Sequence, residues 1–269
     1  MQPIIRLFVE QDMTEGEAFS FAGGNVVVYS SRCPGKGTAN EDAAILIQTD
    51  DDRGVLAVAD GAGGLPGGEH AARVALDTLA HAVGEKNGRP ESGLRTMILD
   101  GFERANQAVL ELGIGAATTL AAVEVDGSNV RSYHVGDSEA FVTGQRGKIK
   151  LRTIPHTPVA YATEAGFLDE EEAMRHEDRH LVSNMVGMPD MKIEIGPSIT
   201  LGTRDTLLIA SDGVSDNLTT EEIINRTRVG QMEKTARQLI DDCLTRMLEP
   251  QDGLPCKPDD TTFILYRRN

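Results

Sequence analysis

The order of strands and helices predicted along the chain restricts its fold more than any other feature. Short apolar and β-branched runs, bounded by Gly, Asp and Pro, predict buried strands at residues 21–29, 43–48 and 55–59. Two long helices follow, because apolar residues recur at helical spacing over residues 72–83 and 94–112. A helix pair in this place is unlike the regular βαβ alternation of a parallel sheet.

The second half of the chain also alternates strands with a helix pair. Residues 119–151 predict a meander of antiparallel strands, whereas residues 155–190 predict a polar surface excursion with a short helix over 169–175. A strand at 206–210, helices at 220–228 and 233–248, and a strand at 262–266 follow. We therefore predict an α+β fold, with antiparallel sheets covered by helices, in a single domain over residues 1–269.

Charge and cysteine content restrict the partners and the compartment of such a domain. The 42 Asp and Glu residues exceed the 26 Lys and Arg residues, and the formal charge of -16 repels a nucleic acid backbone. Cys33, Cys243 and Cys256 form neither a disulfide framework nor a paired metal motif, which favours a reducing cytoplasm. No stretch approaches the length of a membrane span, so we expect a cytoplasmic monomer that contacts neither nucleic acid nor membrane.

Two aspartates stand at equivalent places relative to predicted strands. Asp60 follows an apolar run and precedes Gly61, and Asp212 follows another apolar run and precedes Gly213. A carboxylate at the end of a buried strand is held rigidly, and the following Gly lets the backbone turn so that its carbonyl can also face an ion. Asp-Gly is also a common turn dipeptide, so one such pair alone indicates only a turn. Two in the same context favour a cation site.

Three further acidic segments lie at predicted strand termini. Asp137 follows the strand that ends near Val135, Asp259-Asp260 precede the last strand, and Glu41-Asp42 precede the strand that begins at residue 43. Hard cations such as Mg²⁺ and Mn²⁺ prefer oxygen ligands, with waters completing the shell. Five acidic sites at strand ends are therefore interpreted as a metal centre rather than as solvated surface.

The same segments resemble the PPM family, the metal-dependent protein phosphatases also called type 2C, in its bacterial form. They occur in the family's order and extend from about residue 25 to the C-terminus. The matching segments are Asn40-Glu41-Asp42-Ala43, Val58 to Gly64 with Gly68-Glu69 and Ala71-Ala72, Ala117-Thr118-Thr119-Leu120, Val135-Gly136-Asp137-Ser138, Ala210 to Asp216, and Asp259-Asp260-Thr261-Thr262. The resemblance implies a four-layer α-β-β-α sandwich of two antiparallel sheets flanked by helix pairs.

The resemblance also implies roles for individual residues. Asp60 bridges two ions, Mn²⁺ or Mg²⁺, while the Gly61 carbonyl binds one of them and Asp212 and Asp259 complete the shell of the other. Asp42 and Glu41 act largely through bound waters. Asp137, together with Asp212, corresponds to the acids that hold a third, weaker ion in bacterial members.

The activity implied by the resemblance is hydrolysis of phosphoserine and phosphothreonine in proteins, countering a serine/threonine kinase. A water activated between two divalent cations attacks phosphorus, so no protein nucleophile is required. The resemblance places residues 155–190 beside the catalytic cleft as a flap, and we use this name for them below.

Two positions depart from the family pattern. Members commonly carry an Arg four residues before the Glu of the first motif, where this chain has Gly37, so we predict Lys36 as the phosphate contact, with Arg32 further away. Ala62 stands where eukaryotic members often have a His that could donate a proton, and His156, His176 and His180 in the flap are the other candidates for that role.

Two alternative functions remain open at this point. The missing Arg suits a non-catalytic regulator that keeps the fold and the metals, although such a protein usually loses one of the ligand acids, and here all are present. A phosphatase for small phosphorylated metabolites is the second alternative.

Overall fold

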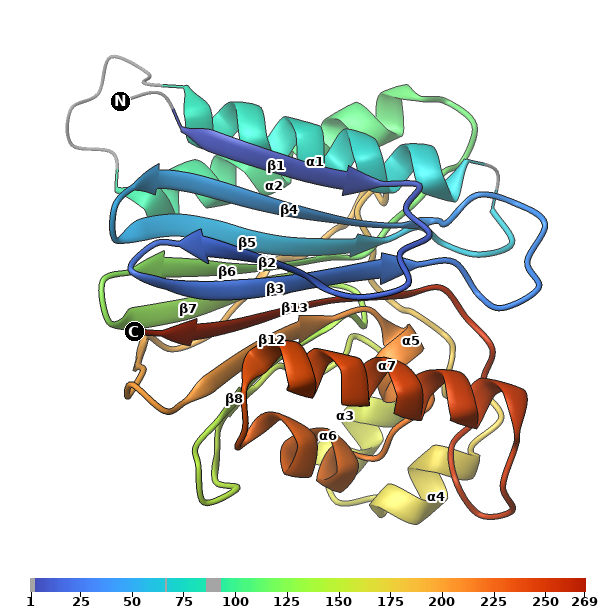
Figure 1. Cartoon of the computed structure of the whole chain (residues 1–269). Coiled ribbons are helices and arrows are strands. Elements are labelled where there is room, and N and C mark those ends of the chain that lie inside the picture. Colours follow the sequence, from blue (N-terminus) through green and yellow to red (C-terminus); the bar gives the residue numbers. More distant parts are fainter. Residues whose placement is uncertain (1–2, 66, 86–92) are drawn as a thin grey trace.

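Two antiparallel β-sheets pack face to face, and a layer of helices covers the outer face of each (Figure 1). The computed structural model describes residues 3–65, 67–85 and 93–269. The predicted four-layer α-β-β-α sandwich is confirmed.

The first sheet contains the order β1 (Ile4–Val9), β4 (Asp42–Asp50), β5 (Arg53–Asp60), β6 (Leu120–Asp126), β7 (Asn129–Val135) and β10 (Glu194–Ile195), with β11 (Ile199–Thr200) also paired to β7. The second sheet contains the order β2 (Glu17–Phe21), β3 (Gly24–Ser31), β13 (Thr261–Arg268), β12 (Thr206–Ala210), β8 (Glu139–Thr143) and β9 (Ile149–Arg152). Helices α1 (Gly68–Gly84) and α2 (Leu94–Glu111) cover the first sheet, and α6 (Thr220–Thr227) and α7 (Met232–Leu248) cover the second.

Alternation along the central strands supplies apolar side chains to two layers at once. In β4, Ile45 and Ile47 pack toward α1 and α2, whereas Ala44 and Leu46 pack between the two sheets. Successive side chains of a strand point to opposite faces, so a strand buried on both faces must be apolar throughout. This explains why the strand runs in the sequence are continuous rather than alternating.

The chain crosses between the sheets where the sequence predicts one meander. Strands β6 and β7 pair in the first sheet, but β8 and β9 pair in the second, so the prediction of a single meander over residues 119–151 is wrong. The crossing occurs at Gly136, whose φ of 102° is open to glycine and strained for other residues. Asp137 therefore lies at the junction between the two sheets.

Other boundaries differ from the predicted ones in a similar way. The run over residues 21–29 is not one strand: β2 ends at Phe21 and β3 begins at Gly24 after a tight turn. The flap contains the predicted short helix, α4 (Glu170–Arg175), and a second helix, α3 (Pro158–Glu164), that periodicity did not indicate. No helix in the described ranges combines the length and the apolar character needed to cross a bilayer.

Packing between α2 and α1 generates the first prediction. Phe102 is completely buried in the layer beneath these helices. We expect Phe102→Ala to lower the free energy of unfolding by about 3–5 kcal/mol, because the lost apolar contact leaves a cavity. Phe167→Ala is the matched control, since Phe167 in the flap is 82% exposed, and its effect should stay within about 0.5 kcal/mol. Urea unfolding measures the free energy of unfolding of both variants. Equal losses in Phe102→Ala and Phe167→Ala would contradict the burial of Phe102 beneath α1 and α2.

Candidate metal centre

Strand register brings the predicted acidic residues to one edge of the sandwich. Asp42 at the start of β4 lies directly opposite Asp60 at the end of β5. In the second sheet, β12 ends two residues before Asp212, and its antiparallel neighbour β13 begins just after Asp259 and Asp260. Asp137 lies on the crossing between the sheets. The structure thus brings all five acidic segments together.

The carboxylates at this edge lie close enough to resist ionisation. Burial, and then the charges of Asp42 and Asp212, raise the pKa of Asp60 well above its usual range. Burial, and then the charges of Asp216 and Asp137, likewise raise the pKa of Asp212. The pKa of Asp42 rises to about 7 and that of Asp137 to about 6, with burial as the main cause in both cases. Such a cluster is strained until cations neutralise it.

Hydrogen bonds from neighbouring strands fix the backbone of Asp60. Its N–H donates to Thr119 Oγ1 at 3.0 Å, and its carbonyl oxygen accepts from Thr118 Oγ1 and Thr119 N, both at 2.8 Å. Thr119 Oγ1 also contacts Ser138 Oγ at 2.7 Å, beside Asp137. Asp60 and the crossing between the sheets are therefore held by the same threonine.

A second group of hydroxyls connects Asp42 to the other sheet. Ser211 Oγ donates to Asp42 Oδ2 at 2.7 Å and accepts from Thr262 N at 3.0 Å. Thr262 Oγ1 in turn contacts Ser30 Oγ at 2.8 Å. These hydroxyls fix the orientation of Asp42 and fasten the two sheets together beside the carboxylates.

Two glycines are required by close backbone approach. A Cβ at Gly61 would lie 2.3 Å from the backbone of Gly68, and a Cβ at Gly213 would lie 1.9 Å from the carbonyl oxygen of Asp260. Any other residue would push the acidic segments apart at these points. The Asp-Gly pairs are therefore more than turn signals.

Lys36 is held by carboxylates rather than pointing freely to solvent. Its Nζ lies 2.6 Å from Asp260 Oδ2 and 2.7 Å from Glu41 Oε2. Burial disfavours the charged form, but these two partners outweigh it and raise the pKa of Lys36. Asp260 also accepts hydrogen bonds from the N–H groups of Cys33 and Glu41, both at 2.7 Å. A phosphate contact by Lys36 stays a prediction, and position 37 is open, because a Cβ on Gly37 would meet nothing within 4 Å.

A second lysine, Lys257, lies among the acids although no sequence pattern indicates it. Lys257 Nζ is 2.8 Å from Asp212 Oδ2, 3.0 Å from Asp216 Oδ2 and 2.8 Å from Asp259 Oδ2. Asp216 also pairs with His180 Nδ1 of the flap at 3.0 Å. Burial favours a raised pKa for Asp216, but His180 and Lys257 outweigh it and hold the pKa below its usual value.

Another cluster in the described part of the chain, His134, His156 and Glu194, has donor atoms within 4.8 Å of one another. His156 Nδ1 accepts from Gly136 N at 3.1 Å and from Asn184 Nδ2 at 2.8 Å, so the proton resides on Nε2, which faces Glu194 Oε2 at 3.4 Å. Nε2 then has no lone pair for a metal. Burial lowers the pKa of both imidazoles, which keeps them neutral. The cluster is a structural contact between β7, β10 and the flap.

Both ends of the flap are tied to residues next to the aspartates. His156 N donates to the carbonyl oxygen of Gly136 at 3.0 Å, and Ser183 donates to the carbonyl oxygen of His156 through N and Oγ, both at 2.8 Å. Further along, Thr118 and Val186 exchange two backbone hydrogen bonds. The flap is therefore anchored to the loops that position Asp60 and Asp137.

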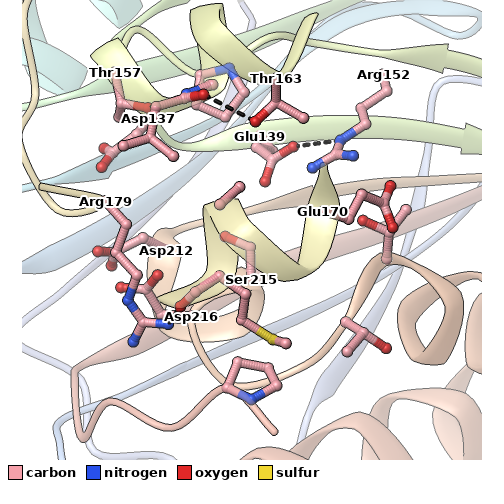
Figure 2. A pocket seen from close by; sticks show the side chains of 18 of the residues that line it. Asp137, Glu139, Arg152, Thr157, Thr163, Glu170, Arg179, Asp212, Ser215 and Asp216 are labelled. Atoms are coloured by element: carbon pink, nitrogen blue, oxygen red, sulfur yellow. Dashed lines mark hydrogen bonds and ion pairs between the residues drawn. The ribbon is translucent and has the colours of Figure 1, made fainter. Parts of the chain in front are cut away.

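A cavity of about 810 Å³ lies between the flap and the start of α6. Asp137, Asp212 and Asp216 line one part of it, and the pair formed by Arg152 Nε and Glu139 Oε2 at 2.9 Å lines another (Figure 2). Helices α3 and α4 contribute much of the remaining wall. The acidic edge thus opens into a space large enough for a segment of another molecule.

A family model described as protein phosphatase 2C matches residues 31–250. The chain belongs to the protein phosphatase 2C family. The match includes the segments of Asp42, Asp60, Asp137 and Asp212 but ends before Asp259.

Relatives and solved structures agree with membership of the protein phosphatase 2C family. The chain is 28% identical over 197 residues to the serine/threonine protein phosphatase PstP of Mycobacterium tuberculosis, covering 70% of this chain but only 37% of PstP. It is 27% identical over 240 residues to the serine/threonine phosphatase stp of Listeria welshimeri, covering 86% of this chain and 90% of the relative. The S. agalactiae serine/threonine phosphatase superposes with a TM-score of 0.76 at 25% identity, covering 91% and 99% of the two chains.

The protein phosphatase 2C signature in the sequence located the acids but not all of their partners. Asp216 follows Asp212 by one turn of the short helix α5 (Asp212–Ser215), which the spacing could have indicated. Lys257, two residues before Asp259, carries no pattern in the sequence that points to the centre. Only the fold places its ammonium group among three carboxylates.

The burial of Asp260 generates the second prediction. Asp260 is 3% exposed. An Asn there would set an amide NH₂ group against the N–H of either Cys33 or Glu41, and Lys36 would lose one of its two negatively charged partners. We expect Asp260→Asn to lower the free energy of unfolding by about 2–3 kcal/mol. The exposed pair of Asp126 with Arg53 gives a matched control, and Asp126→Asn should cost less than about 1 kcal/mol. Chemical denaturation compares the two, and equal costs would refute a structural role for Asp260.

Proposed function

We propose that this chain removes phosphate from phosphoserine and phosphothreonine side chains of proteins, with two divalent cations, Mn²⁺ or Mg²⁺, as cofactors. The observation that carries the proposal is the cluster of buried and half-buried carboxylates, with raised pKa values, at the strand ends of a protein phosphatase 2C fold. Residues 1–269 serve as one phosphatase domain that acts as a cytoplasmic monomer and opposes a serine/threonine kinase.

The donor set supports a pair of hard cations. All the assigned side chains offer carboxylate oxygens, which Mg²⁺ and Mn²⁺ prefer. We assign Asp60, the Gly61 carbonyl, Asp212 and Asp259 as ligands. Asp42 and Glu41 act through waters, and Asp137 with Asp212 takes a possible third ion. PstP, a relative of this chain, has been solved as its catalytic domain in complex with 2 manganese ions.

Bound divalent cations supply the Lewis acidity that activates a water for attack on phosphorus and that neutralises the phosphoryl oxygens. The chain's own contribution is rigidity and charge. Thr119 holds the backbone of Asp60 and Ser211 holds the carboxylate of Asp42, through the hydrogen bonds described above. The acidic edge is fixed before substrate arrives, which limits the reorganisation needed during reaction.

The phosphate contact and the proton donor are proposed from position. Lys36 is the cation nearest to the first motif, and it can meet phosphate only if it keeps one donor free of Glu41 and Asp260. Among the flap histidines, His180 lies nearest to the acids, with its Nδ1 on Asp216. Arg179 Nε donates to His180 Nε2 at 2.8 Å, so His180 carries its proton toward Asp216.

Proteins are favoured over small metabolites as substrates because the acidic edge opens into a broad cavity beside the flap. Relatives of this chain are named serine/threonine protein phosphatases, which supports the same choice. A panel of phosphopeptides and a generic aryl phosphate, each assayed with Mn²⁺ or with EDTA, separates a protein phosphatase from a metabolite phosphatase and from a non-catalytic regulator.

The third prediction concerns Asp60 and Asp212. Each suffers repulsion from its neighbours without metal, so Asp60→Asn and Asp212→Asn should leave the metal-free melting temperature equal or slightly higher. Mn²⁺ should raise the melting temperature of the parent chain much more than that of either variant, because ligand bound to the native state stabilises it by mass action. Turnover of a phosphopeptide should fall by at least about 100-fold.

Asp126→Asn again serves as the control, since it removes one carboxylate that pairs with Arg53 at the surface. Its Mn²⁺-induced melting shift and its turnover should match those of the parent. If Asp60→Asn or Asp212→Asn retained both the shift and the turnover, the metal-site assignment would be wrong.

The fourth prediction concerns the flap. Because Ser183 bonds directly to the carbonyl oxygen of His156, a short Gly-Ser linker can replace residues 158–178 without separating these two anchors, and it keeps Arg179 and His180. Loops beside active sites select substrates more than they perform chemistry. The shortened chain should therefore lose at least about tenfold in kcat/KM on its best phosphopeptide and change by less than about threefold on an aryl phosphate. Equal losses on both substrates would argue that the flap serves the chemistry itself.

A further inference from the structure

Lys257 places a positive charge inside the group of acids to which the metal ligands are assigned. Its Nζ lies within 2.8–3.0 Å of one oxygen from each of Asp212, Asp216 and Asp259. The ammonium group donates a hydrogen bond to Asp212 Oδ2, and the oxygens of Asp216 and Asp259 lie within ion-pair distance of it. The Lys257 side chain is 29% exposed, and its partners Asp212 and Asp216 are 14% and 17% exposed.

This arrangement differs from an ordinary surface ion pair. An exposed ion pair involves one carboxylate and contributes little to the free energy of unfolding, whereas Lys257 neutralises a cluster of carboxylates that repel one another. Lys36 does the same for Glu41 and Asp260, but those are not the carboxylates that Lys257 contacts. The two lysines therefore neutralise different carboxylates of the acidic edge.

Two of the oxygens that Lys257 occupies belong to residues assigned to a divalent cation. A Mg²⁺ ion binds carboxylate oxygens at about 2.0–2.1 Å, and an ammonium group 2.8 Å from both Asp212 Oδ2 and Asp259 Oδ2 competes with it for the negative charge of those oxygens. The two cations also repel each other at such a separation.

We propose that Lys257 is a built-in competitor of the metal centre, a cation of the chain itself that a divalent ion must displace from Asp212 and Asp259. Lys257 stabilises the metal-free chain and weakens divalent cation binding, so that it sets the metal concentration at which the centre fills. This inference rests on the metal ligands assigned under the proposed function, and it adds Lys257 as a residue that lowers the affinity of that site for metal.

The test compares Lys257→Met, which keeps the length of the side chain and removes its charge, with Lys257→Arg, which keeps the charge. By calorimetric titration, Lys257→Met should bind Mn²⁺ at least about tenfold more tightly than the parent at one site, and Lys257→Arg should remain within about threefold of it. Without metal, Lys257→Met should melt at a lower temperature than the parent, and Mn²⁺ should raise that temperature by more.

Lys150→Met is the matched control, because Lys150 pairs with the single carboxylate of Asp205 at the opposite end of β12. It should leave Mn²⁺ affinity unchanged. The inference is overturned if Lys257→Met binds Mn²⁺ no more tightly than the parent, if Lys150→Met tightens binding equally, or if neither the parent nor Lys257→Met binds Mn²⁺ at all.

A second measurement uses the parent chain alone and does not depend on the folding of any variant. Acetylation by acetic anhydride, followed by mass spectrometry of peptides, reports how accessible each lysine amine is. Lys257 should be protected without metal and should become at least about threefold more reactive as Mg²⁺ is added, while Lys150 stays constant. Constant reactivity of Lys257 across a Mg²⁺ range that saturates the chain would overturn displacement.

Neither readout involves turnover. An inactive parent chain whose Mn²⁺ affinity still responds to Lys257 would contradict the proposed phosphatase activity and support the competitor role. An active parent chain whose Mn²⁺ affinity is unchanged in Lys257→Met would support the proposed phosphatase activity and contradict the competitor role.

Discussion

Repulsion among carboxylates buried at one edge of two facing sheets is the constraint on which the rest of this structure depends. The register of β4 with β5 sets Asp42 opposite Asp60, and the end of β12 brings Asp212 into the same cluster. Burial makes each charge harder to maintain and each neighbour more repulsive, which is why the pKa values of these acids rise. When these acids are ionised, a chain that keeps such a cluster must either supply cations of its own or bind them.

This chain has both solutions available. Lys36 and Lys257 neutralise separate parts of the acidic edge, and Asp42, Asp60 and Asp137 have raised pKa values. The buried carboxylate of Asp260 fits this picture, because an acid in that position needs the ammonium group of Lys36 beside it. Gly37, which replaces the usual Arg, leaves open space next to that pair. The first motif and the last strand are thus coupled through charge as well as through hydrogen bonds.

Rigidity around the acids comes from the sandwich rather than from the acids themselves. Contacts of Thr119 with Ser138 and of Ser211 with Asp42 connect the two sheets, and Gly61 and Gly213 permit backbone contacts that a Cβ would prevent. The flap shares the same anchors, since its two ends bond to Gly136 and Thr118 beside the aspartates. A change in the flap can therefore reach the acidic edge through these hydrogen bonds and through the pair of His180 with Asp216, which suits a segment that selects substrates beside a fixed centre.

The sequence by itself determined the α+β class, most strand and helix positions, and the acids that gather at one edge, because apolar periodicity and strand-terminal Asp-Gly pairs are local patterns. It did not determine that β8 leaves the first sheet for the second, since hairpins in one sheet and in two sheets have the same local pattern. The partners of Lys36, Lys257 and His180 were also decided only by the tertiary structure. Each of these contacts joins the side chain to at least one carboxylate from a distant segment, such as Asp260 for Lys36 and Asp212 for Lys257, and the distance between such segments depends on how the two sheets pack rather than on any spacing along the chain.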